Sequence, residues 1–226
     1  MKKTIIICIF AGLLDANVIL HQKEFTVKKT IKSWIEFKNE NLTRQKYDFS
    51  CGSASLSTVL KFFYGINVSE KEVLDTILKS KGFFTITKKR LESQKFSLSF
   101  FDLAKFSNYK GFKAIGLALN MEALKKLKAP VILFVKIRED EHFTVFKNID
   151  KNYVYLADPS FGNIKVKIAK FKEMFFQRDD LTYPGKILAI IPIYNEQKKK
   201  INYNFLKINK SSKFIYENIK DSITSF

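Results

Sequence analysis

Three residues that lie far apart in the chain have side chains suited to covalent chemistry: Cys51, His142 and Asp158. A thiolate is a strong nucleophile for acyl transfer, but it needs a base that takes and returns a proton. An imidazole can be that base, and a carboxylate beside it holds the ring in one tautomer and favours its charged form. The three residues could therefore form the catalytic set of a cysteine hydrolase, provided that the fold brings them together.

Cys51 opens a segment whose pattern predicts a helix over 51–64. In the first turn of a helix, the backbone N–H groups and the helix dipole favour negative charge, and so favour the thiolate. Gly52 and Ser53 are small, which we expect to let a substrate backbone approach the sulfur. Gln45 lies six residues before Cys51, and its amide can donate to a developing oxyanion alongside the Cys51 N–H.

His142 and Asp158 lie at opposite ends of two predicted strands, 143–149 and 153–157, with a turn between them. Antiparallel pairing places the start of one strand beside the end of the next, so the two side chains can be neighbours. Taken singly, His142 could be an ordinary strand-end histidine and Asp158 a turn-forming residue before Pro159. Their combination with a cysteine at a helix start favours the catalytic interpretation. The other histidine, His21, lies just after an apolar N-terminal stretch (residues 4–14), where we expect no organised site.

The remaining patterns predict an α+β domain, in which N-terminal helices pack on a mostly antiparallel sheet. Helices are predicted over 51–64, 69–80, 99–109, 121–127 and 169–175, and strands over 113–119, 131–138, 143–149, 153–157, 164–168 and 187–193. The segment 83–97 has no clear pattern.

The chain divides by composition into four parts. These are a signal peptide (1–16), a lead-in with a helix near 31–37 (17–41), the catalytic domain (42–193) and a basic, loosely held tail (194–226). A short positive start followed by about ten apolar residues is typical of a secretory signal, so we expect a periplasmic protein. Loss of the signal removes Cys8 and leaves Cys51 as the one cysteine. A lone thiol in an oxidising compartment favours a chemical role.

The 226 residues carry a formal net charge of +18. The lysines are scattered singly, which indicates a general compositional bias and no nucleic-acid-binding stripe, although weak contact with an anionic membrane surface is compatible with the charge. With two histidines and one mature cysteine, we expect no metal site and no cofactor.

The motif residues resemble those of the C39 cysteine peptidases, which have a papain-like fold and are best known as leader-removing domains of bacteriocin exporters. The resemblance rests on Gln45, Cys51-Gly52, His142-Phe143-Thr144-Val145, and Asp158-Pro159 with Gly162. It implies that Cys51 is the nucleophile, His142 the general base and acid, Asp158 the orienting residue and Gln45 the oxyanion donor.

The run Arg44-Gln45-Lys46-Tyr47-Asp48-Phe49-Ser50-Cys51-Gly52 is most similar to the stand-alone exported branch of that family. Members of this branch include the periplasmic peptidase encoded with functional-amyloid secretion systems. The resemblance therefore implies a protein or peptide substrate, such as an exported or amyloid-system protein. The chain differs from the exporter-linked enzymes at Ser50, where those usually carry Asp.

Two other functions remain open from the sequence. The same catalytic set could act as an amidase or transamidase on a non-peptide acceptor, which an amine-acceptor assay would separate from peptide hydrolysis. A basic, non-catalytic periplasmic adaptor that binds anionic polymers is the second, and failure of a thiol-directed probe to label Cys51 would favour it.

Overall fold

The computed structural model describes residues 17–22, 25–30, 33–83 and 97–208, which fall into two compact units, 1–37 and 38–226. The first unit contains an antiparallel hairpin of β1 (Asn17–Gln22) and β2 (Phe25–Thr30). The sequence patterns predicted only a helix in this part of the chain, which is present as α1 (Trp34–Asn39). The predicted signal peptide lies outside the described residues, as does most of the segment without a clear pattern.

Between residues 51 and 193, the helical elements of the second unit lie close to the ranges that the sequence predicted. They are α2 (Cys51–Thr58), η1 (Val59–Phe63), α3 (Glu70–Ser80), α5 (Phe100–Tyr109), α6 (Met121–Lys125) and α7 (Ile168–Phe175). The Ser69 hydroxyl accepts from the Glu72 N–H at the start of α3, and Ser99 with Asp102 forms a capping box at the start of α5. Among the described residues, no helix is long and apolar enough to cross a bilayer.

The predicted helix over 51–64 differs from the observed one in its last turns. These turns are π-helical, with the Tyr64 N–H donating to the Val59 carbonyl. The wider turns coincide with the burial of both Phe63 and Tyr64, which are only 1% and 2% exposed. Gly65 then ends the helix with a φ of +68°, a conformation that glycine adopts readily.

The sheet has six strands, all of which the sequence predicted and all of which pair antiparallel. They are β3 (Phe112–Leu119), β4 (Val131–Ile137), β5 (Asp140–Ile149), β6 (Tyr153–Asp158), β7 (Gly162–Lys167) and β8 (Gly185–Pro192). Their order is β3-β8-β4-β5-β6-β7, so the last strand enters between β3 and β4. The expected α+β class is thereby confirmed.

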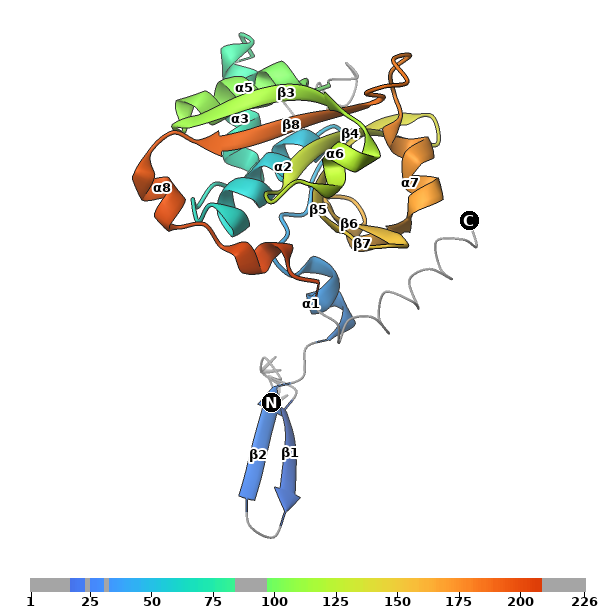
Figure 1. Ribbon diagram of the computed structural model, residues 1–226. Helices are drawn as coiled ribbons and strands as arrows, with labels where there is room; N and C mark the ends of the chain where they lie inside the picture. Colours follow the sequence, from blue (N-terminus) through green and yellow to red (C-terminus); the bar gives the residue numbers. More distant parts are fainter. Residues whose placement is uncertain (1–16, 23–24, 31–32, 84–96, 209–226) are drawn as a thin grey trace, which may run out of the picture. The chain divides into compact units, whose positions relative to one another are not determined.

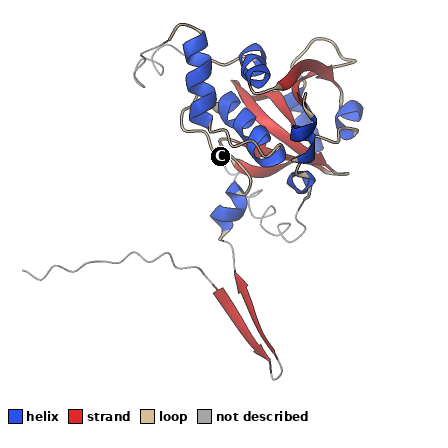
Figure 2. Cartoon of the chain, turned by 90° about the vertical axis from the view of Figure 1, so that its left-hand side faces the viewer, coloured by secondary structure: helices blue, strands red, loops and turns tan. Residues whose placement is uncertain are grey.

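Two hydrophobic clusters cover the two faces of this sheet. Successive strand residues point to opposite faces, so Ile132 joins the cluster with α2, α3 and α5, while Leu133 joins the cluster with α6 and α7. Figures 1 and 2 show helices on both sides of the strands. The helix that begins with Cys51 therefore lies on one defined face of the sheet.

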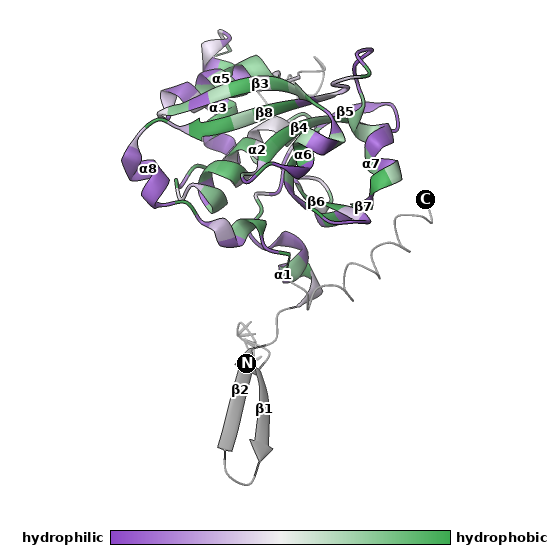
Figure 3. Ribbon diagram, viewed as in Figure 1, coloured by the Kyte–Doolittle hydropathy of each residue, from purple (hydrophilic) through white to green (hydrophobic). Residues whose placement is uncertain are grey.

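The described part of the C-terminal tail packs on the domain, so the expectation of a loosely held tail is wrong for residues 195–208. This part contains α8 (Asn195–Lys199) and η2 (Tyr203–Leu206). Phe205 is 1% exposed and contacts the Phe63 ring, while the Asn202 N–H donates to the Phe63 carbonyl at 2.8 Å. The residues of α8 are hydrophilic (purple in Figure 3), and they include lysines whose abundance hides this apolar anchor in the sequence.

Candidate active site

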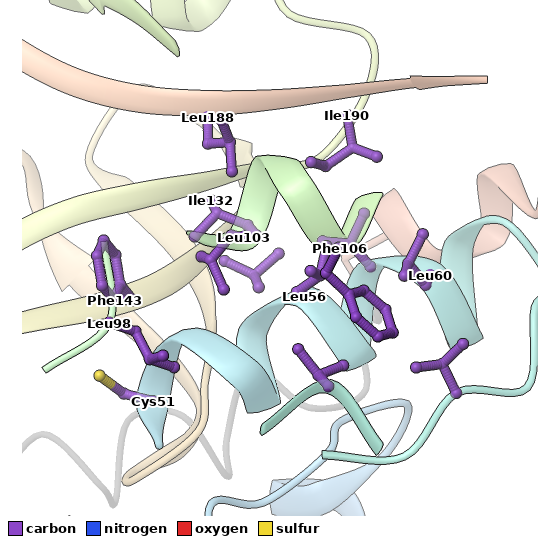
Figure 4. Packing of buried hydrophobic residues seen from close by; sticks show 14 of the residues in the cluster. Cys51, Leu56, Leu60, Leu98, Leu103, Phe106, Ile132, Phe143, Leu188 and Ile190 are labelled. Carbon is purple, nitrogen blue, oxygen red and sulfur yellow. The ribbon is translucent and has the colours of Figure 1, made fainter. Parts of the chain in front are cut away.

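Cys51 begins α2, as the sequence predicted, and only 8% of its surface is exposed. Figure 4 shows it on the first turn of the helix, near Leu98 and Phe143. Ser50 is the N-cap residue, but its side chain makes no capping hydrogen bond to the helix. The first-turn N–H groups thus keep their capacity to stabilise negative charge at the sulfur.

The small residues after Cys51 permit close packing, and the expectation that they let a substrate backbone approach the sulfur remains a prediction. Gly52 and Ser53 are both buried. A Cβ atom at Gly52 would lie 3.1 Å from the Phe143 ring, and the Ser55 hydroxyl donates to the Phe143 carbonyl. Close packing of α2 on β5 is what these residues permit.

His142 comes from β5, which follows a tight turn at Arg138 and Glu139. The strand begins at Asp140, slightly earlier than predicted, and the left-handed φ of Arg138 (58°) makes the shorter turn possible. His142 lies opposite Val135 on β4. The hairpin therefore holds the ring near the beginning of the strand.

Asp158 is the last residue of β6 and is 1% exposed. Its Oδ2 lies 2.9 Å from the His142 Nε2. The pairing between β5 and β6 places Val145 opposite Ala157, so His142 reaches the carboxylate diagonally across the strands. The structure thus brings together the imidazole and carboxylate that the sequence predicted as neighbours.

The His142 ring hydrogen-bonds to both of its predicted partners, Asp158 and Cys51. Burial favours the neutral ring, but hydrogen bonds to Asp158 and Cys51, with the charges of both, outweigh burial and raise the pKa of His142 to about 10. Because Nε2 faces Asp158, Nδ1 is the nitrogen left for the sulfur. An imidazole that hydrogen-bonds to a thiol on one side and a carboxylate on the other is an arrangement suited to a cysteine nucleophile.

The turn after β6 fixes the Asp158 carboxylate. Its Oδ1 accepts from the backbone N–H groups of Ser160 and Phe161, both at 2.9 Å. Gly162 closes the turn with a φ of +89°, and a Cβ atom there would lie 2.8 Å from the Lys38 carbonyl oxygen. Both oxygens of the Asp158 carboxylate are therefore hydrogen-bonded, which fixes the carboxylate against the His142 ring.

Gln45 is held against this same turn. Its backbone N–H donates to the Pro159 carbonyl at 3.1 Å, and its side-chain Oε1 accepts from the Ser160 hydroxyl at 2.7 Å. The neighbouring Arg44 guanidinium donates to the Ser160 carbonyl. With the amide oxygen occupied, the Gln45 NH₂ group remains as a donor.

Two residues that the sequence did not identify anchor the loop between Gln45 and Cys51. Glu70, at the start of α3, is 3% exposed and accepts from the Ser50 hydroxyl at 2.5 Å and the Lys46 N–H at 2.8 Å. In the sequence, Glu70 resembles an ordinary first-turn acidic residue of a helix. Ser160 was missed too, since only the adjacent Asp-Pro pair marks its position.

His21, the second histidine, is part of β1 in the first unit. All residues of the site described above belong to the second unit.

The sequence profile of the Peptidase C39 family matches residues 39–178. The chain is 33% identical over 135 residues to a protein of Pseudomonas fluorescens named "Probable functional amyloid protease FapD", covering 60% of this chain and 57% of that protein. A protein of the same name from Pseudomonas aeruginosa is 31% identical over 64% of this chain and 61% of its own length. The chain thus spans less than two thirds of these relatives.

Among solved structures, the fold is similar to the peptidase domain of Streptococcus ComA, described as a bi-functional ABC transporter involved in quorum sensing. The two share 19% sequence identity with a TM-score of 0.50, over 67% of this chain and 97% of that domain. At this level of identity, the similarity concerns the fold.

Proposed function

The chain belongs to the peptidase C39 family, and on that basis we propose that it is a cysteine peptidase with Cys51 as nucleophile. The observation that carries the proposal is the contact of His142 with both Cys51 and Asp158, with a 2.9 Å distance between His142 Nε2 and Asp158 Oδ2. One imidazole that faces a thiol on one side and a buried carboxylate on the other is suited to proton transfer during acyl transfer.

In the first half of the reaction, the Cys51 sulfur attacks the carbonyl carbon of the scissile peptide bond. The carbonyl oxygen becomes an oxyanion, which the Gln45 NH₂ group and the Cys51 backbone N–H stabilise. His142 gives its proton to the leaving amine, and the C–N bond breaks. The acyl group then remains on Cys51 as a thioester.

In the second half, His142 takes a proton from water, and the resulting hydroxide attacks the thioester carbonyl. The same donors stabilise the second oxyanion. The C–S bond breaks, the product leaves as a carboxylic acid, and the thiolate returns. Asp158 orients the imidazole throughout, because its other oxygen is held by the turn that follows β6.

The substrate that we propose is a secreted or periplasmic protein. Two features support it: similarity to proteins named as probable functional amyloid proteases, and the signal-like composition of residues 1–16. The proposed signal would direct the enzyme to the periplasm, and the proposed catalytic domain, 42–193, would act there on a protein that follows the same route.

The test compares exported proteins from cells that make the wild type, Cys51→Ala or Cys8→Ala. Labelling of new N-termini, followed by mass spectrometry, should find cleavage products with the wild type and with Cys8→Ala, and none with Cys51→Ala. Cys8→Ala is the matched control because it removes the other cysteine of the chain. Products that persist with Cys51→Ala would contradict the proposal.

A further inference from the structure

One turn of the chain contacts both halves of the proposed catalytic machinery. Asp158 extends from it to His142, and the Ser160 hydroxyl extends from it to the Gln45 Oε1 at 2.7 Å. The Pro159 carbonyl accepts from the Gln45 backbone N–H, so the glutamine is fixed at its backbone as well as at its side chain. Ser160 has no contact with the reacting groups that would make it a catalytic residue.

The two ends of a glutamine amide have opposite effects on an oxyanion. The NH₂ group donates hydrogen bonds and stabilises it, whereas the amide oxygen repels it. A hydroxyl that donates to Oε1 selects the orientation in which NH₂ is free. We propose that Ser160 is a positioning residue that sets the orientation of the Gln45 amide, an inference that rests on the proposed function.

The inference separates two properties of Cys51 that are usually measured together. Attack on p-nitrophenyl acetate forms a carbon–sulfur bond, passes through an oxyanion, and expels p-nitrophenolate to leave an acetyl thioester. Attack on iodoacetamide displaces iodide from a saturated carbon and forms no oxyanion. The ratio of the two rates thus reports oxyanion stabilisation, while alkylation alone reports the thiolate and its imidazole.

For Ser160→Ala, we expect acylation of Cys51 by p-nitrophenyl acetate to slow about tenfold, below the 10²–10³-fold cost of deleting an oxyanion donor outright. Alkylation by iodoacetamide, and its pH profile, should stay within about twofold of the wild type. Ser160→Thr keeps the hydroxyl and should keep the acylation rate. Ser80→Ala is the matched control, because its hydroxyl donates to a helix carbonyl at the end of α3.

A second pair of variants tests whether Ser160 acts through Gln45. Gln45→Ala should slow acylation more than Ser160→Ala does, and adding Ser160→Ala to it should cause no further loss. A Ser160→Ala penalty that persists without Gln45, an equal loss in acylation and alkylation, or unchanged acylation would each overturn the inference. A wild type that is alkylated but never acylated at Cys51 would instead remove the proposed function, and the inference with it.

Discussion

At the scale of single residues, His142 is the side chain that links the other two members of the proposed catalytic set. It contacts Cys51 and Asp158, and these contacts raise its pKa to about 10 despite burial. The sequence could predict both partners, because Cys51 begins a helix and Asp158 ends a strand adjacent to that of His142. It could not predict the diagonal reach of the ring, which depends on the register of β5 against β6.

The raised pKa of His142 predicts a pH dependence of stability. A group whose pKa is higher in the folded state contributes stability that is complete below its unfolded value, here 6.5, and is lost as the pH rises through about 10. Urea denaturation of the wild type and His142→Gln should therefore give free energies of unfolding that converge between these pH values. Asp158→Asn should shift the loss to lower pH. A difference that grows with pH would contradict the assignment.

At the scale of elements, the loop between Gln45 and α2 depends on a carboxylate from α3. Glu70 accepts from Lys46 and Ser50, at either end of this loop. No local pattern in the sequence marks these contacts, because Glu70 lies 20 residues after Ser50 and 24 residues after Lys46. The same reason hides Ser160, whose partner Gln45 lies 115 residues away.

Removal of the Glu70 carboxylate should leave the buried Ser50 hydroxyl and the partly buried Lys46 N–H without this acceptor. We expect Glu70→Ala to lower the free energy of unfolding by about 1–3 kcal/mol, the cost of unsatisfied buried polar groups. It should also slow alkylation of Cys51 by iodoacetamide. Glu72→Ala is the control: its carboxylate pairs with Lys110 near the surface, and its loss should cost less than about 1 kcal/mol. Equal effects of the two variants would show that Glu70 does not anchor the loop.

At the scale of the whole molecule, the sheet separates two hydrophobic clusters, and only one of them underlies Cys51. The alternation of apolar residues predicted the strands, and the helical spacing predicted the helices. The order of the strands was not predictable from these local patterns, because the pairing of β8 between β3 and β4 is set by tertiary packing. The burial of Phe205 was hidden for the same reason.

Because the sheet separates the two clusters, we expect core variants on its two faces to differ in their effect on the reactivity of Cys51. Leu56, in the helix that carries Cys51, and Phe171, in α7, are both fully buried. Alanine at either position should lower the free energy of unfolding by about 2–5 kcal/mol. Only Leu56→Ala should slow alkylation of Cys51 in the folded protein. A similar slowing with Phe171→Ala would contradict the independence of the two faces.

The turn from Asp158 to Gly162 also bears on the order of events during synthesis and folding. Cys51 is synthesised long before this turn, and until the turn has formed, neither the imidazole nor the amide at position 45 has its fixed partner. A nascent or unfolded chain therefore carries a thiol of ordinary reactivity. If the proposed roles hold, we expect Cys51 to become reactive only once β6 and β7 have paired.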